Sequence, residues 1–139
     1  GLSMGSMMYS TGLSAWIGDC IVRALGGSPS QVVLIGTFCV LALFLSEISS
    51  HTAATNMVGP LAITTAIAAG FDPVPVAVGV ALSASLGFML PVSTPPNAIV
   101  YASGYTPITT MIRAGSIIDV IGIFLVTIPL VIFVVSAVV

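Results

Sequence analysis

The sequence predicts an all-α membrane protein that combines a re-entrant helical hairpin, a broken transmembrane helix and a C-terminal transmembrane span. Three observations support this fold class. First, 58% of the 139 residues are hydrophobic and only 4% are charged, whereas a water-soluble domain carries about 25% charged residues. Lipid is therefore the expected solvent. Second, the apolar runs have the length of membrane helices. Third, short polar segments interrupt two of these runs.

Composition also excludes several function classes. A net charge of −2 without a basic cluster gives no reason to expect a nucleic-acid partner. Cys20 and Cys39 lie in apolar contexts, so we interpret both as buried small hydrophobic residues rather than as a disulfide or a metal site. The sequence offers no nucleophile–base pair and no phosphate-binding loop, so we expect neither an enzyme nor a cofactor. It opens without a basic n-region or a Met, so we expect a fragment of a longer chain without a signal peptide.

Residues 1–30 are predicted to form the end of a spanning helix followed by a helix on the membrane surface. The first part, residues 1–11, is rich in small residues and Met. Residues 14–25 repeat apolar side chains at helical spacing, with Asp19 and Arg23 four residues apart on another face. This helix is too short to cross a bilayer, and Trp16 and Arg23 suit the headgroup boundary.

Residues 31–70 are predicted to form the hairpin. A helix over residues 31–49 would be about 28 Å long, and a second helix over residues 53–69 is rich in Ala, Thr and Met. The polar segment Ser49-Ser50-His51-Thr52 separates them. The two arms could both span with the polar turn at a surface, or they could form a re-entrant hairpin whose tip lies inside the bilayer. The small, hydroxyl-rich second arm favours burial against protein, and hence the hairpin.

Residues 71–105 are predicted to form the broken helix. One helix covers residues 76–90 and a short one covers residues 97–103. Between them lie three prolines, Ser93 and Thr94, and proline disfavours helix at the residue before it. In a chain this apolar, irregular backbone at membrane depth must pack against protein or line a wet cavity.

Residues 106–139 are predicted to form an interfacial segment and a C-terminal transmembrane helix. The interfacial segment covers residues 108–115 and contains Arg113. Residues 116–139 are almost entirely apolar and would reach about 36 Å, which is enough to span with some tilt. Pro129 is a potential kink. Arg113 and Asp119 are placed near the surface, where they would serve as anchors or in an ion pair.

The two polar breaks together predict a transport site. A helix that starts after each break would direct unpaired N–H groups and a partial positive charge toward the break, and could hold a carboxylate without Arg or Lys. Unpaired carbonyls and hydroxyls at the preceding helix ends could bind a hard cation such as sodium. Discontinuous helices in transporters combine these two features. In the simpler interpretation, the Ser and Thr side chains only cap the broken helices.

Two stretches of the chain resemble a known family. Residues 47–53 read EISSHTA and residues 89–104 read MLPVSTPPNAIVYASG, and both are similar to the C-terminal repeat of the divalent anion/sodium symporters. The resemblance implies one half of an inverted-repeat transporter, with an N-terminal repeat upstream, a homodimeric assembly and an elevator-like motion. It implies a multi-pass protein of the cell (inner) membrane that carries di- or tricarboxylates with sodium. A sodium-independent or proton-linked exchanger is the alternative, and a channel or non-transporting scaffold is the second.

The resemblance also assigns site residues. Those expected to contact the substrate carboxylate are Ser50, His51, Thr52, Thr94 and Pro95. Those expected to surround a cation are Ser46, Ser49, His51 and Ser93. His51 departs from the family, which usually has Asn at this position. A ring nitrogen is a poor sodium ligand, so sodium coupling at this half competes with proton coupling or anion exchange. Glu47 is the one acid well inside an apolar run, and we expect it to orient the hairpin tip or to be structural.

Overall fold

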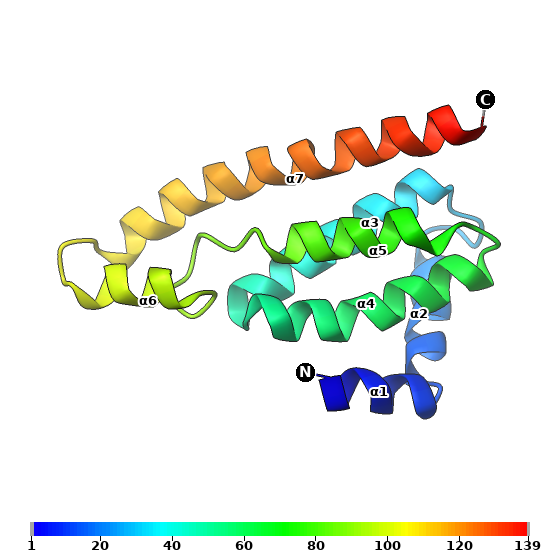
Figure 1. Cartoon of the computed structure of the whole chain (residues 1–139), viewed down its shortest axis with the longest axis horizontal. Coiled ribbons are helices and arrows are strands. Elements are labelled where there is room, and N and C mark those ends of the chain that lie inside the picture. Colours follow the sequence, from blue (N-terminus) through cyan, green and yellow to red (C-terminus); the bar gives the residue numbers. More distant parts are fainter. Residues whose placement is uncertain (1, 139) are drawn as a thin grey trace.

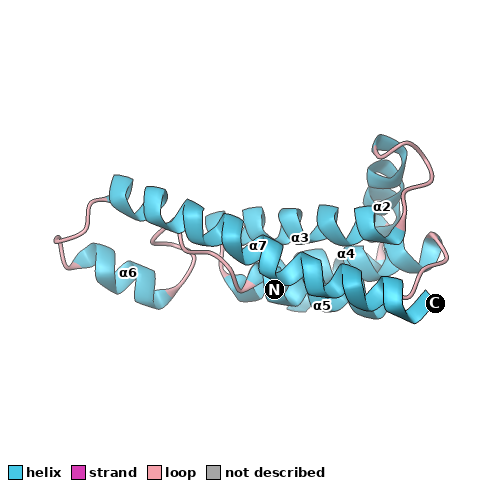
Figure 2. Ribbon diagram, turned by 90° about the horizontal axis from the view of Figure 1, so that it is seen from above, coloured by secondary structure: helices cyan, strands magenta, loops and turns pink. Residues whose placement is uncertain are grey.

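The computed structural model describes residues 2–138, and within this range every regular element is an α-helix. This confirms the predicted all-α class. Two helices, Gln31–Ile48 and Ile108–Ser136, are long and apolar enough to cross a membrane. The helices α3, α4, α5 and α7 run along the long axis of the molecule, and α2 lies across one end of them (Figures 1 and 2).

The N-terminal part contains α1 (Leu2–Ser10) and α2 (Leu13–Ala24), joined at Gly12. Gly12 has a φ of 74°, which is readily adopted by glycine and lets the chain turn sharply. The predicted pair on α2 forms, with 2.7 Å between Arg23 Nη2 and Asp19 Oδ2. Cys39 is buried as expected, but Cys20 is exposed on α2, so its interpretation as a buried residue was wrong.

The hairpin consists of α3 (Gln31–Ile48) and α4 (His51–Ala68). Its turn is shorter than predicted because α4 begins at His51 rather than at residue 53. The Ser50 side chain accepts a hydrogen bond from the N–H of Ala53 at 3.2 Å, and this cap satisfies a backbone donor in the first helical turn. His51 and Thr52 are therefore the first residues of a helix and not part of an irregular loop.

The broken helix consists of α5 (Pro73–Ala84) and α6 (Pro95–Ala102). The prediction of a helix over residues 76–90 was wrong at both ends. At its start, the Asp72 carboxylate caps the N–H of Val74 at 3.0 Å, so the helix begins earlier. At its end, α5 stops at Ala84, and residues 85–94 lack α-helix. We call residues 85–94 the unwound segment.

The C-terminal part is a single helix, α7 (Ile108–Val138), which is 31 residues long and contains Pro129. Residues 108–115, the predicted interfacial segment, form the first turns of this helix, and their place at the membrane interface stays a prediction. Figures 1 and 2 show α6 and the α6–α7 loop beyond the α3–α4 turn, so the hairpin lies beside only part of α7.

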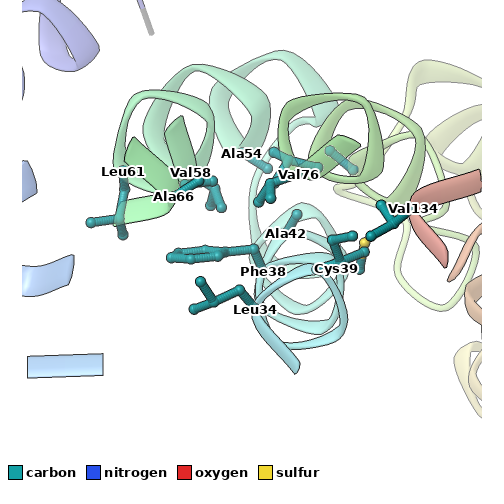
Figure 3. Packing of buried hydrophobic residues seen from close by; sticks show 14 residues of the cluster. Leu34, Phe38, Cys39, Ala42, Ala54, Val58, Leu61, Ala66, Val76 and Val134 are labelled. Atoms are coloured by element: carbon teal, nitrogen blue, oxygen red, sulfur yellow. The ribbon is translucent and has the colours of Figure 1, made fainter. Parts of the chain in front are cut away.

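The core lies where α3, α4 and α5 pack together, with α7 closing one side through Val134. Figure 3 shows Phe38 and Leu34 of α3 facing Val58 and Leu61 of α4. A Cβ atom added at Gly79 of α5 would lie 2.8 Å from Cys39 Sγ, so α5 approaches α3 more closely than a side chain there would allow. This close packing holds the hairpin turn beside the end of α5.

Candidate functional site

The hairpin turn and the unwound segment meet through Ser46 and His51. The Ser46 hydroxyl donates to the carbonyl of Ala84 at 2.6 Å and lies 2.5 Å from His51 Nδ1. A hydroxyl has one proton and a carbonyl can only accept, so His51 donates its Nδ1–H to Ser46. The last residue of α5 and the first residue of α4 are thus linked by one buried serine.

Gly87 of the unwound segment lies directly against the Ser46–His51 contact. A Cβ atom at position 87 would lie 2.7 Å from His51 Cε1 and 3.0 Å from Ser46 Oγ. Any side chain at this position would therefore displace His51 or the segment itself. The backbone of residue 87 forms part of the wall around the imidazole.

Glu47 holds the next part of the unwound segment. Its side chain is 2% exposed, and its carboxylate accepts from the N–H of Met89 at 3.1 Å and of Leu90 at 3.0 Å. The Ser93 hydroxyl lies 3.2 Å from the same carboxylate and 3.1 Å from the Glu47 carbonyl, and these two acceptors share its one proton. Glu47 therefore orients the unwound segment against the end of α3, whereas the sequence predicted that it would orient the hairpin tip or be structural.

Asn97 and Asp119 complete the contacts of the unwound segment. The Asn97 side-chain amide donates to the carbonyls of Gly87 at 3.1 Å and Leu90 at 3.2 Å. Asp119 of α7 is 3% exposed and accepts from the N–H of Phe88 at 3.3 Å. The prediction that Asp119 is a surface anchor was wrong, because α7 is continuous and turns this side chain toward the segment. An acid within an apolar helix is the signal that could have identified it.

The predicted substrate residues lie at the starts of α4 and α6. Ser50 and Thr94 cap these two helices through their side chains. His51 and Thr94 are half-buried, whereas the other three are exposed: Ser50, Thr52 and Pro95. Within residues 2–138, no hydrogen bond joins the α4 members of this set to the α6 members. Their contact with a substrate stays a prediction.

The predicted cation residues are more deeply placed. Ser46 and Ser93 are buried, and Ser49 is half-buried and donates to the carbonyl of Leu45 at 2.6 Å. His51 contacts Ser46 directly. Ser93 bonds to Glu47, the residue that follows Ser46 in the chain. The three hydroxyls keep oxygen lone pairs that could bind a cation. The donating Nδ1–H of His51 cannot do so.

The two helix starts differ in what they offer an anion. In α4 the N–H groups of His51 and Thr52 are the first two of the helix, and the cap from Ser50 begins only at Ala53. In α6 the first two residues are Pro95 and Pro96, which have no N–H, and Thr94 already accepts from Asn97. The expectation that both starts present free N–H groups is therefore correct only for α4.

An apolar helical chain with a hairpin and an interrupted helix that meet at polar breaks has the architecture of a secondary transporter. A comparison with known families agrees with this class. The family described as "Sodium:sulfate symporter transmembrane region" matches residues 1–136. The chain belongs to this family, and the two long apolar helices agree with an integral membrane protein.

Curated relatives extend this result. The chain is 36% identical over 123 residues to the "Sodium-dependent dicarboxylate transporter SdcS" of Staphylococcus saprophyticus, covering 88% of this chain and 23% of that protein. It is 35% identical over 130 residues to the rat "Solute carrier family 13 member 2", covering 94% and 22%. It is 35% identical over 123 residues to the rat "Na(+)/citrate cotransporter", covering 88% and 21%. The chain thus spans about a fifth of the length of these relatives.

Proposed function

We propose that this chain supplies half of the substrate site of a sodium-coupled transporter of di- or tricarboxylates. The observation that carries this proposal is the meeting of the α3–α4 turn with the unwound segment, through Ser46, His51 and Glu47. Two polar helix breaks at one place are what a transporter needs to hold a polar solute inside a membrane. The names of relatives, which include a dicarboxylate transporter and a citrate cotransporter, favour carboxylates as the solute.

In this proposal the start of α4 binds the substrate carboxylate. The free N–H groups of His51 and Thr52 and the helix dipole attract an anion. The hydroxyl of Ser50 lies at the same helix start, and Thr94 and Pro95 approach from α6. Because the two prolines leave α6 without free N–H groups, Thr94 contributes through its side chain and the α6 dipole only.

The cation in this proposal is bound by the oxygens of Ser46, Ser49 and Ser93, with His51 beside them. The sodium-dependent relatives support sodium as the coupled ion. His51 supports the rival function, a sodium-independent or proton-linked exchanger, because its ring presents nitrogen where the family usually presents an amide oxygen. The choice between symport and exchange therefore depends on this residue.

The wider architecture is also proposed from the resemblance. We infer a re-entrant hairpin, an inverted N-terminal repeat that supplies the other half of the site, and a homodimer in the cell (inner) membrane. Elevator-type alternating access would then move the hairpin and the broken helix as one body. The hydrogen bonds that join the unwound segment to α3, α6 and α7 support a common movement of these elements.

Uptake by proteoliposomes that contain the full natural protein tests the proposed function. We expect saturable uptake of labelled succinate or citrate that requires an inward sodium gradient. Uptake that needs only an internal dicarboxylate would establish the exchanger, and an absence of saturable uptake would leave a channel or scaffold.

The substitution His51→Asn tests the cation assignment in the same assay. An amide oxygen in place of the imidazole should increase the dependence of uptake on sodium. Ser85→Ala is the matched control, because Ser85 is the first residue of the unwound segment and its side chain bonds only to the carbonyl of Ala81. An unchanged cation profile in His51→Asn would remove the special role of this side chain.

A further inference from the structure

One face of α7 packs against the unwound segment. Gly115, Asp119 and Gly122 are spaced by four and three residues and so lie on the same side of the helix. A Cβ atom at Gly115 would lie 2.5 Å from the backbone carbon and oxygen of Phe88. A Cβ atom at Gly122 would lie 2.8 Å from Leu86 Cδ2. Gly115 lets the backbone of Phe88 lie against α7, and Gly122 makes room for the side chain of Leu86.

Asp119 provides the polar contact between this face of α7 and the unwound segment. One oxygen, Oδ1, accepts from the N–H of Phe88, while the other, Oδ2, is buried and has no partner within the described residues. Glu47 binds the next two N–H groups of the same segment, those of Met89 and Leu90. Phe88 therefore needs one acceptor oxygen at position 119, and nothing in the contacts requires the second.

We propose that Asp119 is a positioning residue of the transport site, which acts by fixing the backbone of Phe88. Together with Glu47 it holds three consecutive N–H groups, those of residues 88, 89 and 90. These contacts set the position of the adjacent Gly87 over His51 and Ser46. The role rests on the proposed function. It depends on an acceptor oxygen rather than on the negative charge.

The pair of substitutions Asp119→Asn and Asp119→Leu separates the acceptor from the charge. In Asp119→Asn the amide oxygen still accepts from Phe88, and the amide N–H₂ takes the place of the oxygen that has no partner. In Asp119→Leu the Phe88 N–H loses its acceptor. We expect Asp119→Asn to keep apparent KM values for sodium and citrate within about twofold of the natural protein. We expect Asp119→Leu to raise them about tenfold, as for one lost buried hydrogen bond.

Gly115→Ala provides a second route to the same displacement. Its methyl group would push Phe88 away from α7 while Asp119 is kept, so it should raise the same KM values, measured on the protein that folds. Gly59→Ala on α4 is the matched control, because a Cβ atom there has no neighbour within 4 Å. Asp19→Asn on α2 is the control for removing a carboxylate at the surface. A purely structural role would lower the amount of folded protein and Vmax instead of shifting KM.

Hydrogen exchange of the detergent-solubilised full protein separates this inference from the proposed function. The amides of residues 88–90 should exchange faster in Asp119→Leu and at the natural rate in Asp119→Asn, whether or not carboxylates are transported. If the natural protein shows no carboxylate uptake, the proposed function fails and the exchange data still decide the inference. Equal KM values and exchange rates in Asp119→Leu and the natural protein would overturn it. So would an Asp119→Asn variant that behaves like Asp119→Leu.

Discussion

At the scale of single residues, the two buried acids next to the unwound segment differ in how many of their carboxylate oxygens accept hydrogen bonds. Glu47 uses both oxygens, since Oε1 accepts from Met89 and Oε2 from Leu90 and Ser93. Asp119 uses one. The same chemical change, from carboxylate to amide, should therefore have opposite outcomes at the two positions.

Glu47→Gln is expected to destabilise the protein by about 1–3 kcal/mol and to abolish most uptake. Glutamine would place an N–H₂ group against a backbone N–H that needs an acceptor, and a buried donor left without a partner costs about this much. Thermal denaturation of the full natural protein in detergent would measure the loss, with Asp19→Asn as the control. A Glu47→Gln variant with natural stability and natural uptake would show that these backbone contacts are not important.

The sequence predicted the chemistry of the caps and of Glu47 but not the partners of the two acids. The capping roles of Ser50 and Thr94 can be predicted from the sequence because a cap binds the N–H of a residue three positions away. Glu47 bonds to backbone N–H groups that lie 42 and 43 residues further along the chain. Every residue except proline has such a group, so no side chain marks these partners in the sequence.

At the scale of secondary-structure elements, helix starts were easier to predict than the end of α5. Residues 85–90 read SLGFML, which contains no proline and mostly residues that tolerate helix. They leave the helix because Glu47, Asp119 and Asn97 bind their backbone groups. In α7, residues 108–115 were expected as a segment distinct from the spanning helix, but one helix covers both, and Gly115 makes room for Phe88 within it.

The packing of α2 on α4 leads to a prediction about Gly18. A Cβ atom at this position would lie 2.2 Å from Thr65 Oγ1, and Thr65 is itself buried and bonded to the carbonyl of Leu61 at 2.7 Å. Gly18→Ala should therefore push α2 away from α4 and destabilise the protein by about 1–3 kcal/mol.

Gly36→Ala on α3 is the matched control for this substitution. A Cβ atom at Gly36 meets nothing within 4 Å, so alanine there should stabilise the helix by about 0.5–1 kcal/mol. Thermal denaturation of both variants in detergent compares them directly. A Gly18→Ala variant that melts at or above the temperature of Gly36→Ala would mean that α2 does not pack against Thr65.

At the scale of the whole molecule, the lengths of the helices bear on how deeply the hairpin reaches. With 31 residues, α7 extends about 46 Å, which exceeds the roughly 30 Å hydrocarbon core of a bilayer. The 18 residues of α3 extend about 27 Å. Figures 1 and 2 show α6 and the α6–α7 loop beyond the α3–α4 turn. If α7 spans the bilayer, the hairpin turn lies short of the surface at which the α6–α7 loop is found.

Cysteine labelling of the full natural protein in oriented vesicles should place these points in the membrane. The background would carry Cys20→Ala and Cys39→Ala. Ser28→Cys, in the exposed turn before α3, and Tyr105→Cys, which replaces a side chain that is 93% exposed, should react with a membrane-impermeant maleimide from opposite sides. Ser50→Cys at the hairpin turn should react more slowly than either, and citrate with sodium should slow it further, because the bound anion would cover the start of α4.

If both arms of the hairpin instead cross the bilayer, Ser50→Cys will react as fast as Tyr105→Cys, from the same side and regardless of substrate. That result would move the proposed carboxylate site out of the membrane, because its α4 half would then lie at the surface.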